Sequence, residues 1–308
     1  MGIVALRGKR GTQLIFGAVQ LGLIYALMAM GNYISFRILN IPDLTVDGSF
    51  ALGMAVSVMT AAGGHPYLAL FAAIIAGALA GLVTGLLQTK VGINPILAGI
   101  LTMTALYSVN LFVMKGKANQ SLIGKETVFS SFERLFKGVQ RNIPRTILMI
   151  IVVALVAAIL AVFFKTRLGM AIRATGDNEE MVRASSINAD FTKCVGFALA
   201  NACIALAGGL VCQYNQSADT GYGSGMLVVG LASVIIGEAV LRHGGVTRGI
   251  ISVALGAVLY QLIIALALKV NLLPAYGLKF VSATIVAVAL AMPKIKETVA
   301  NHTRKKVD

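Results

Sequence analysis

Charged side chains are scarce in this sequence, and acidic ones are the scarcest. Asp, Glu, Lys and Arg together make up 12% of the 308 residues, with 12 acids against 26 Lys and Arg. A soluble domain of this length carries about twice that charged fraction. Since 57% of the residues are hydrophobic, the composition excludes an ordinary soluble domain.

Catalytic and nucleotide-binding motifs are also missing. There is no GxxxxGK followed by Ser or Thr, no HExxH and no GxSxG, so a P-loop, a zinc protease site and a nucleophile elbow are not expected. The three histidines, His65, His243 and His302, are dispersed. We therefore expect no catalytic residue, no metal site and no cofactor on this chain.

Cysteine is rare too. Cys194, Cys203 and Cys212 fall in one apolar segment, with no His or further Cys nearby to complete a metal site. Their spacing of nine does not place them on one helix face. The three cysteines are therefore predicted to be packing residues.

Long apolar runs are what the sequence does contain. Runs of about 20 residues recur along the chain, enough to cross a hydrocarbon core of roughly 30 Å. They predict an all-α polytopic membrane protein of about 8–10 transmembrane helices, in a single domain over residues 1–308. Nine segments can be delimited, at 13–36, 44–62, 67–88, 93–114, 146–165, 191–213, 226–241, 249–268 and 274–292.

The net charge of +14 is interpreted as a membrane signal, because basic residues gather in inside loops near anionic headgroups. No nucleic-acid-binding motif accompanies it. The basic tail at 293–308 favours the cytoplasm, and so do Arg242 and Arg248. Nine spans then place the N-terminus outside, together with the loop 115–145 and its seven Lys or Arg. That conflict with the positive-inside rule would be removed if segment 226–241 were re-entrant.

Gly77, Gly81 and Gly85 recur at every fourth position of the third segment. Such a stripe lets helix backbones approach closely. It predicts either packing within one chain or a face for a second copy.

The segment between the first two spans is predicted to be broken near 38–48, because Pro42 and Gly48 argue against a continuous helix. It carries Asp43 and Asp47. Three interpretations stay open for these carboxylates: they cap helix starts, line a solute path, or bind a coupled ion or proton. Another acid in an apolar segment, Glu238, is predicted to pair with Arg242 four residues later.

The loop from Thr166 to Asn188 is the one place where charges of both signs crowd together. Arg167, Arg173 and Arg183 are interleaved there with acids, namely Asp177, Glu179 and Glu180. Between two spans, such a loop must face water or another protein. Mixed charge favours a specific docking surface for a soluble partner.

These stretches together point to a family. They are GNYISFRILNIPDLTVDGSFALGMAVS, VGINPILAGILTMTALYSVNL, LGMAIRATGDNEEMVRASSIN and VVGLASVIIGEAVLRHGGVTRGIISVALGAVLYQ. Over about residues 15–290, the sequence resembles the permease subunits of ABC importers in the branched-chain amino acid and ribose permease superfamily. It is most similar to permeases of tryptophan/tyrosine uptake systems, in which NIPDLTVDGSF and RATGDNEEM recur.

The resemblance implies a bacterial cell (inner) membrane protein that works with several partners. A second permease copy completes the pathway, two cytoplasmic ATPase subunits bind ATP and Mg, and an extracellular or periplasmic binding protein delivers the solute. The loop 166–190 would contain a cytoplasmic coupling helix near 170–187 that docks on the ATPase. By position, its coupling residues would be Arg173, Ala174, Gly176, Asp177, Asn178, Glu179, Glu180, Ala184 and Ile187.

One residue departs from the family pattern. Ser186 stands where the family has Gly before the Ile, which bears on the turn at the helix end.

The resemblance also implies a pathway lined by 39–50, 93–104 and 226–238. Asn94 begins a span whose free helix N-terminus suits a carboxylate, and Thr102 and Thr104 are small polar groups in an apolar run. With Asp43, Asp47 and Glu238 they are the candidate lining residues; ordinary packing is the alternative for each. The expected cargo is an amino acid, aromatic or hydrophobic. A sugar or nucleoside importer of the same superfamily and an ion-coupled secondary transporter are the alternatives.

Overall fold

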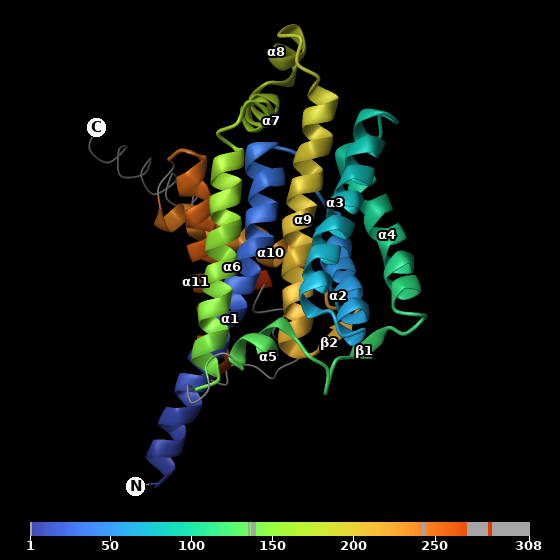
Figure 1. Cartoon of the computed structure of the whole chain (residues 1–308). Helices are drawn as coiled ribbons and strands as arrows, with labels where there is room; N and C mark the ends of the chain where they lie inside the picture. The colour runs from blue at the N-terminus through green and yellow to red at the C-terminus, as the bar shows by residue number, and fades with distance from the viewer. Residues whose placement is uncertain (1, 135, 137–139, 242–243, 270–282, 285–308) are drawn as a thin grey trace, which may run out of the picture.

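The computed structural model describes residues 2–134, 136, 140–241, 244–269 and 283–284, with backbone alone at 2–12 and 268–269. Long helices run side by side through the molecule (Figure 1). The elements are α1 (Gly2–Tyr33), the π-helix η1 (Ile34–Ile38), α2 (Val46–Ala62), α3 (Pro66–Thr89), α4 (Pro95–Val113), β1 (Asn119–Ser121), α5 (Val128–Glu133), α6 (Asn142–Phe163), α7 (Arg167–Asp177), α8 (Glu179–Ala184), α9 (Ala189–Asn215), β2 (Ser217–Asp219), α10 (Met226–Val240) and α11 (Val246–Lys269).

The prediction of an all-α polytopic membrane protein is confirmed. Within the described residues, six helices are long and apolar enough to span a bilayer: α1 with η1, α3, α4, α6, α9 and α11. Two further apolar helices, α2 and α10, are shorter. The ninth predicted segment, 274–292, lies outside the described residues apart from 283–284, as does the tail 293–308.

Local sequence signals begin the helices where they were expected. Pro66 and Pro95 occupy the first turns of α3 and α4, where a missing N–H costs no hydrogen bond. Asn94 caps α4 by accepting a hydrogen bond from the Ile96 N–H at 3.0 Å. At the start of α9, Asn188 does the same for the Phe191 N–H at 3.0 Å.

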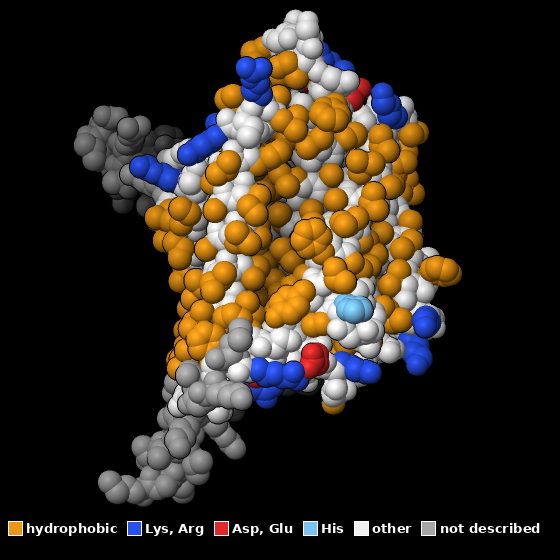
Figure 2. All heavy atoms as spheres, in the orientation of Figure 1, with side chains coloured by type: hydrophobic (Ala, Val, Ile, Leu, Met, Phe, Trp, Pro, Cys, Tyr) orange, Lys and Arg blue, Asp and Glu red, His pale blue; other side chains and the backbone are white. Residues whose placement is uncertain are grey.

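The molecule has two polar ends separated by a hydrophobic belt, which Figure 2 shows as a band of apolar side chains with Lys and Arg above and below it. We call one end the projection end, formed by α7 and α8, and the other the ribbon end, where β1 pairs antiparallel with β2 and α5 lies (Figure 1). The N-terminal part of α1 and the described residues of the loop 115–145 lie at the ribbon end, opposite α7 (Figure 1). Which end faces the cytoplasm stays a prediction.

Helix α9 is the centre of the bundle. It packs against α1, α2 and α3, and its cysteines, Cys194, Cys203 and Cys212, are buried. By contrast α4 and α6 are largely exposed along their apolar faces, as expected of helices that meet lipid. The cysteines are therefore packing residues of the core, as predicted.

The glycine stripe of α3 lies directly against α9. A Cβ placed on Gly77 would come within 2.4 Å of the Asn201 carbonyl oxygen, and one on Gly81 within 2.2 Å of the Phe197 carbonyl oxygen. These separations are far below van der Waals contact, so only glycine permits the observed approach. Packing within the chain is confirmed, and a second-copy face is not where the stripe lies.

We expect Gly81→Leu to reduce the yield of folded protein and its thermal unfolding temperature, because α3 must move away from α9; overpacking costs about 1–3 kcal/mol. Gly17→Leu is the matched control, since a Cβ there has nothing within 4 Å. Size-exclusion chromatography after heating measures both. Equal unfolding temperatures for the two variants would contradict the assigned packing.

Candidate functional sites: the projecting helices and the helix junction

The loop predicted to hold one coupling helix forms two. Helix α7 ends and α8 begins at Asn178, whose extended backbone (φ −158°, ψ 103°) separates them. The Asn178 side chain accepts a hydrogen bond from the Met181 N–H at 3.0 Å and so caps α8. Thr166 caps α7 in the same way through the Gly169 N–H, at 3.3 Å. The expectation of a single helix near 170–187 is therefore corrected, because Asn178 starts a new helix.

An ion-pair network fastens α8 to α9. Glu179 accepts hydrogen bonds from Lys193 at 2.6 Å and from Arg183 at 2.9 Å, and Arg183 also pairs with Asp190. The Lys193 ammonium and then the Arg183 guanidinium hold the pKa of Glu179 below its usual value. Glu179 therefore supports α8 from within the chain and is not available in full to a partner.

The predicted coupling residues divide by exposure. Most point outward on the projection; these are Arg173, Asp177, Asn178, Glu180, Ala184 and Ile187. Ala174 and Gly176 are half-buried. The sequence analysis missed Met170 and Met181, whose side chains are 50% and 54% exposed beside these charges. Apolar side chains in a charged loop have no lipid to contact, so their position there could have indicated a surface that binds a partner.

Gly176 joins the projection to the broken end of the first span. A Cβ on Gly176 would lie 1.9 Å from the Ile38 carbonyl oxygen and 2.9 Å from the Leu39 Cα. Helix α7 thus rests on the last residue of η1 and on Leu39, which follows it. A π-helix within a longer helix often marks a functional site, and this one is in direct backbone contact with the projection.

Glu238 pairs with Arg37, which the sequence did not predict. The Arg37 Nε donates to the Glu238 Oε1 at 2.7 Å, and a second guanidinium nitrogen contacts the other carboxylate oxygen, in a two-point geometry typical of strong Arg–carboxylate pairs. Arg242 lies outside the described residues. The pair joins η1 to α10 across 201 positions of sequence, which local spacing could not reveal.

Asp47 connects two half-length helices inside the bundle. Its carboxylate accepts hydrogen bonds from the Gly225 N–H at 2.9 Å and the Leu227 N–H at 2.8 Å. Asp47 lies in the first turn of α2, yet it caps α10, whose other end carries Glu238 beside Arg37 of η1. Asp47 is therefore a helix cap, but the expectation that it caps the helix that follows it is wrong, because its N–H partners come from a turn far along the chain.

Asp43 is fully buried beside this junction. It accepts hydrogen bonds from the Thr45 N–H at 2.8 Å and the Asn201 amide at 2.8 Å. Thr45 in turn bonds the Thr84 hydroxyl at 2.8 Å. Asn201 lies near the middle of α9, so these bonds satisfy the non-helical backbone and the carboxylate at depth.

Thr102 and Thr104 both donate to the carbonyl four residues back in α4, at 2.9 Å. Thr102 is buried and Thr104 exposed, so the two point to opposite sides of the helix. Helix α4 packs closely on the segment around Asp47, because a Cβ on Gly48 would lie 3.1 Å from the Met103 Cα. Within the described residues, no group of three His, Cys, Asp or Glu could hold a metal ion.

Ser186 adopts the conformation that glycine favours. Its φ is 59°, in the left-handed region that costs an ordinary L-residue about 1–2 kcal/mol. It follows α8 in the turn that leads to Asn188 and α9. Ser186, which replaces the glycine of the family pattern, therefore lies at a position where glycine would relieve backbone strain.

We expect Ser186→Gly to stabilise the α8–α9 turn by up to about 1 kcal/mol. Ser185→Gly is the control, because Ser185 has a φ of −86° and gains nothing from glycine. Hydrogen exchange of the α8 amides measures the difference. Slower exchange in Ser185→Gly than in Ser186→Gly would contradict this strain.

Comparison with known proteins agrees with this architecture. The chain is 35% identical over 278 residues, 90% of each chain, to the tyrosine transport system permease protein of Clostridioides difficile (strain R20291). It is 25% identical over 74% of its length, and 73% of the relative, to a probable branched-chain amino acid transport permease of Methanocaldococcus jannaschii. It is 28% identical over 75% of its length, and 70% of the relative, to the ribose import permease of Escherichia coli (strain K12).

No solved structure matches the chain. The family described as branched-chain amino acid transport system / permease component matches residues 14–289. That match covers the whole bundle, from α1 to the described residues beyond α11. The chain therefore belongs to this family of membrane permease components.

Proposed function

We propose that the chain is the permease subunit of a binding-protein-dependent ABC importer that moves an amino acid, preferably an aromatic one, into a bacterial cell. A separate ATPase would bind ATP and Mg and dock on α7 and α8. A second copy of the chain would complete the pathway, and an external binding protein would deliver the solute. The family match and the relative named for tyrosine transport support this assignment.

The contact of Gly176 with the end of η1 carries the proposal. Through it, a movement of α7 toward η1 would press on Ile38 and Leu39. Arg37 of η1 holds Glu238 near the end of α10, and Asp47 of α2 holds the beginning of α10. A force on the projection would thus have a route through η1 to α10 and α2.

The two alternatives are less well supported. The ribose permease relative is 28% identical, against 35% for the tyrosine permease relative, which favours an amino acid over a sugar. For an ion-coupled carrier, Asp43 and Asp47 would need to exchange an ion or proton. Each already accepts two hydrogen bonds from the chain, which favours structural roles.

We expect Glu180→Arg with Met181→Asp to reduce co-purification of the ATPase at least tenfold, because both side chains point out of the projection. Glu179 is left intact, since its loss would loosen α8 itself. Glu126→Arg at the ribbon end is the matched charge reversal and should leave co-purification unchanged. Normal ATPase association of the double variant would count against docking at this surface.

The Arg37–Glu238 pair permits a charge-swap test of the proposed route. We expect Arg37→Glu and Glu238→Arg each to lower uptake in proteoliposomes about tenfold or more while the ATPase stays bound, because η1 and α10 then repel each other. The double variant should recover a large part of the loss. If both single variants transport normally, the pair does not transmit the motion.

A further inference from the structure

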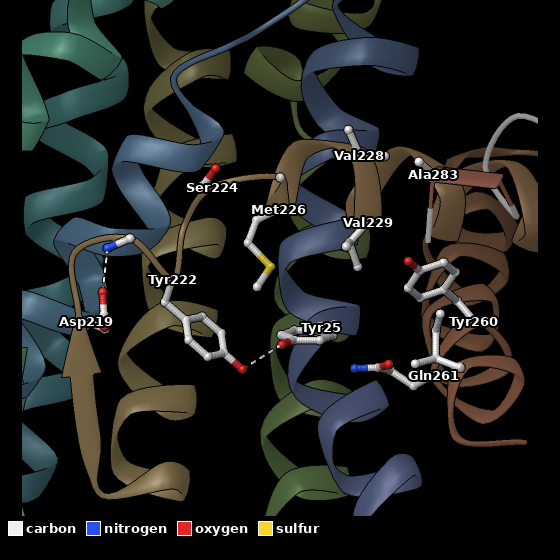
Figure 3. Close-up of a pocket in the computed structure, with 13 residues that line it drawn as sticks. Tyr25, Asp219, Tyr222, Ser224, Met226, Val228, Val229, Tyr260, Gln261 and Ala283 are labelled. Carbon is white, nitrogen blue, oxygen red and sulfur yellow. Dashed lines mark hydrogen bonds between the residues drawn. The ribbon is translucent and has the colours of Figure 1, made fainter. Parts of the chain in front are cut away.

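A cavity of about 660 Å³ opens between α1, α10 and α11. Its size lies within the usual range for small-molecule sites, roughly 300–1,000 Å³. Figure 3 shows the Tyr25 and Tyr222 hydroxyls pointing toward each other on one side of it, with Met226 and Val229 of α10 nearby and Tyr260 and Gln261 of α11 on the other side. Asp219 of β2 also lines the cavity, so the cavity lies towards the ribbon end.

Aromatic rings make part of this wall rigid. The Tyr25 and Tyr222 hydroxyls are hydrogen-bonded at 3.2 Å. Phe50 lies behind them, stacked on Tyr222 with ring centroids 6.3 Å apart and tilted against Tyr25 at the same distance. Such a cluster presents ring faces and edges to an occupant, and aromatic pairs gain about 0.5–1.5 kcal/mol beyond simple burial.

The charges around the cavity restrict what it can hold. Among the residues that the structure describes, Asp219 is the one charged side chain in the lining, and no Lys, Arg or His belongs to it. One Asp219 oxygen accepts from the Gly221 N–H at 2.7 Å, which orients the carboxylate. A phosphate or dicarboxylate would find no cation here, whereas an ammonium group would find a carboxylate and an aromatic ring would find tyrosines.

We propose that this cavity contacts an aromatic amino acid during translocation, with its ring among Tyr25, Tyr222 and Met226 and its ammonium group towards Asp219. The proposal rests on the proposed importer function. Since Met226 and Val229 belong to α10, the solute would touch the same half-helix that Asp47 holds at its start and Arg37 near its end. A motion of α10 would therefore reshape the cavity wall.

Labelling of Ser224→Cys tests occupancy without requiring transport. Ser224 is exposed in the cavity lining, and the native cysteines are buried, so the wild-type protein is the control for background reaction. In the purified permease–ATPase complex, L-tyrosine at millimolar concentration should slow reaction with a small methanethiosulfonate reagent at least threefold. L-Glutamate and ribose should not. No protection by L-tyrosine, protection by ribose instead, or an unreactive introduced thiol would overturn the proposal.

Uptake by the reconstituted importer gives the second readout. We expect Tyr222→Phe and Asp219→Asn to lower the L-tyrosine moved per ATP hydrolysed at least threefold while basal ATPase activity is kept. Tyr214→Phe is the matched control, because it loses a comparable hydroxyl bond, to Gln20 at 3.0 Å, outside the cavity. Equal transport by Tyr222→Phe, Asp219→Asn and Tyr214→Phe would refute the binding site in this cavity and leave the proposed importer function untouched. If the wild-type importer moves no aromatic amino acid, the proposed cargo fails instead.

Discussion

The architecture depends on one carboxylate, Asp47, which joins two segments far apart in the sequence. The first N–H groups of a helix have no partner within the helix and need an acceptor from elsewhere. Asp47, in the first turn of α2, supplies that acceptor for α10. This capping holds the β2–α10 turn, and with it the cavity, against α2.

Close backbone contacts and one ion pair connect the α2–α10 junction at Asp47 to the projection. Glycines let α3 approach α9 and let α7 rest on the end of η1. Arg37 and Glu238 link η1 to α10. Polar contacts also tie the broken segments to the long helices: Asn201 of α9 donates to Asp43, and Thr84 of α3 bonds the Thr45 hydroxyl.

Much of the fold was predictable from single residues and periods. The apolar runs, the break around Pro42, the start of a helix at Asn94 and Pro95, and the close-packing glycines were all recognised, because each is a local or periodic signal. The division of the loop into α7 and α8 was not, although Asn178 is a strong helix cap. The exposure of Met170 and Met181 was not predicted either, because the charged residues dominate the pattern of that loop.

The sequence by itself determined the membrane class, the positions of the spans and the mixed-charge projection, because these follow from hydropathy, length and composition along the chain. Only the tertiary structure decided that Glu238 meets Arg37, that Asp47 caps α10, and that Tyr25, Tyr222 and Gln261 line one cavity. The physical reason is the same for each. These contacts join segments up to about two hundred positions apart, and which donor reaches which acceptor is set by how the helices pack.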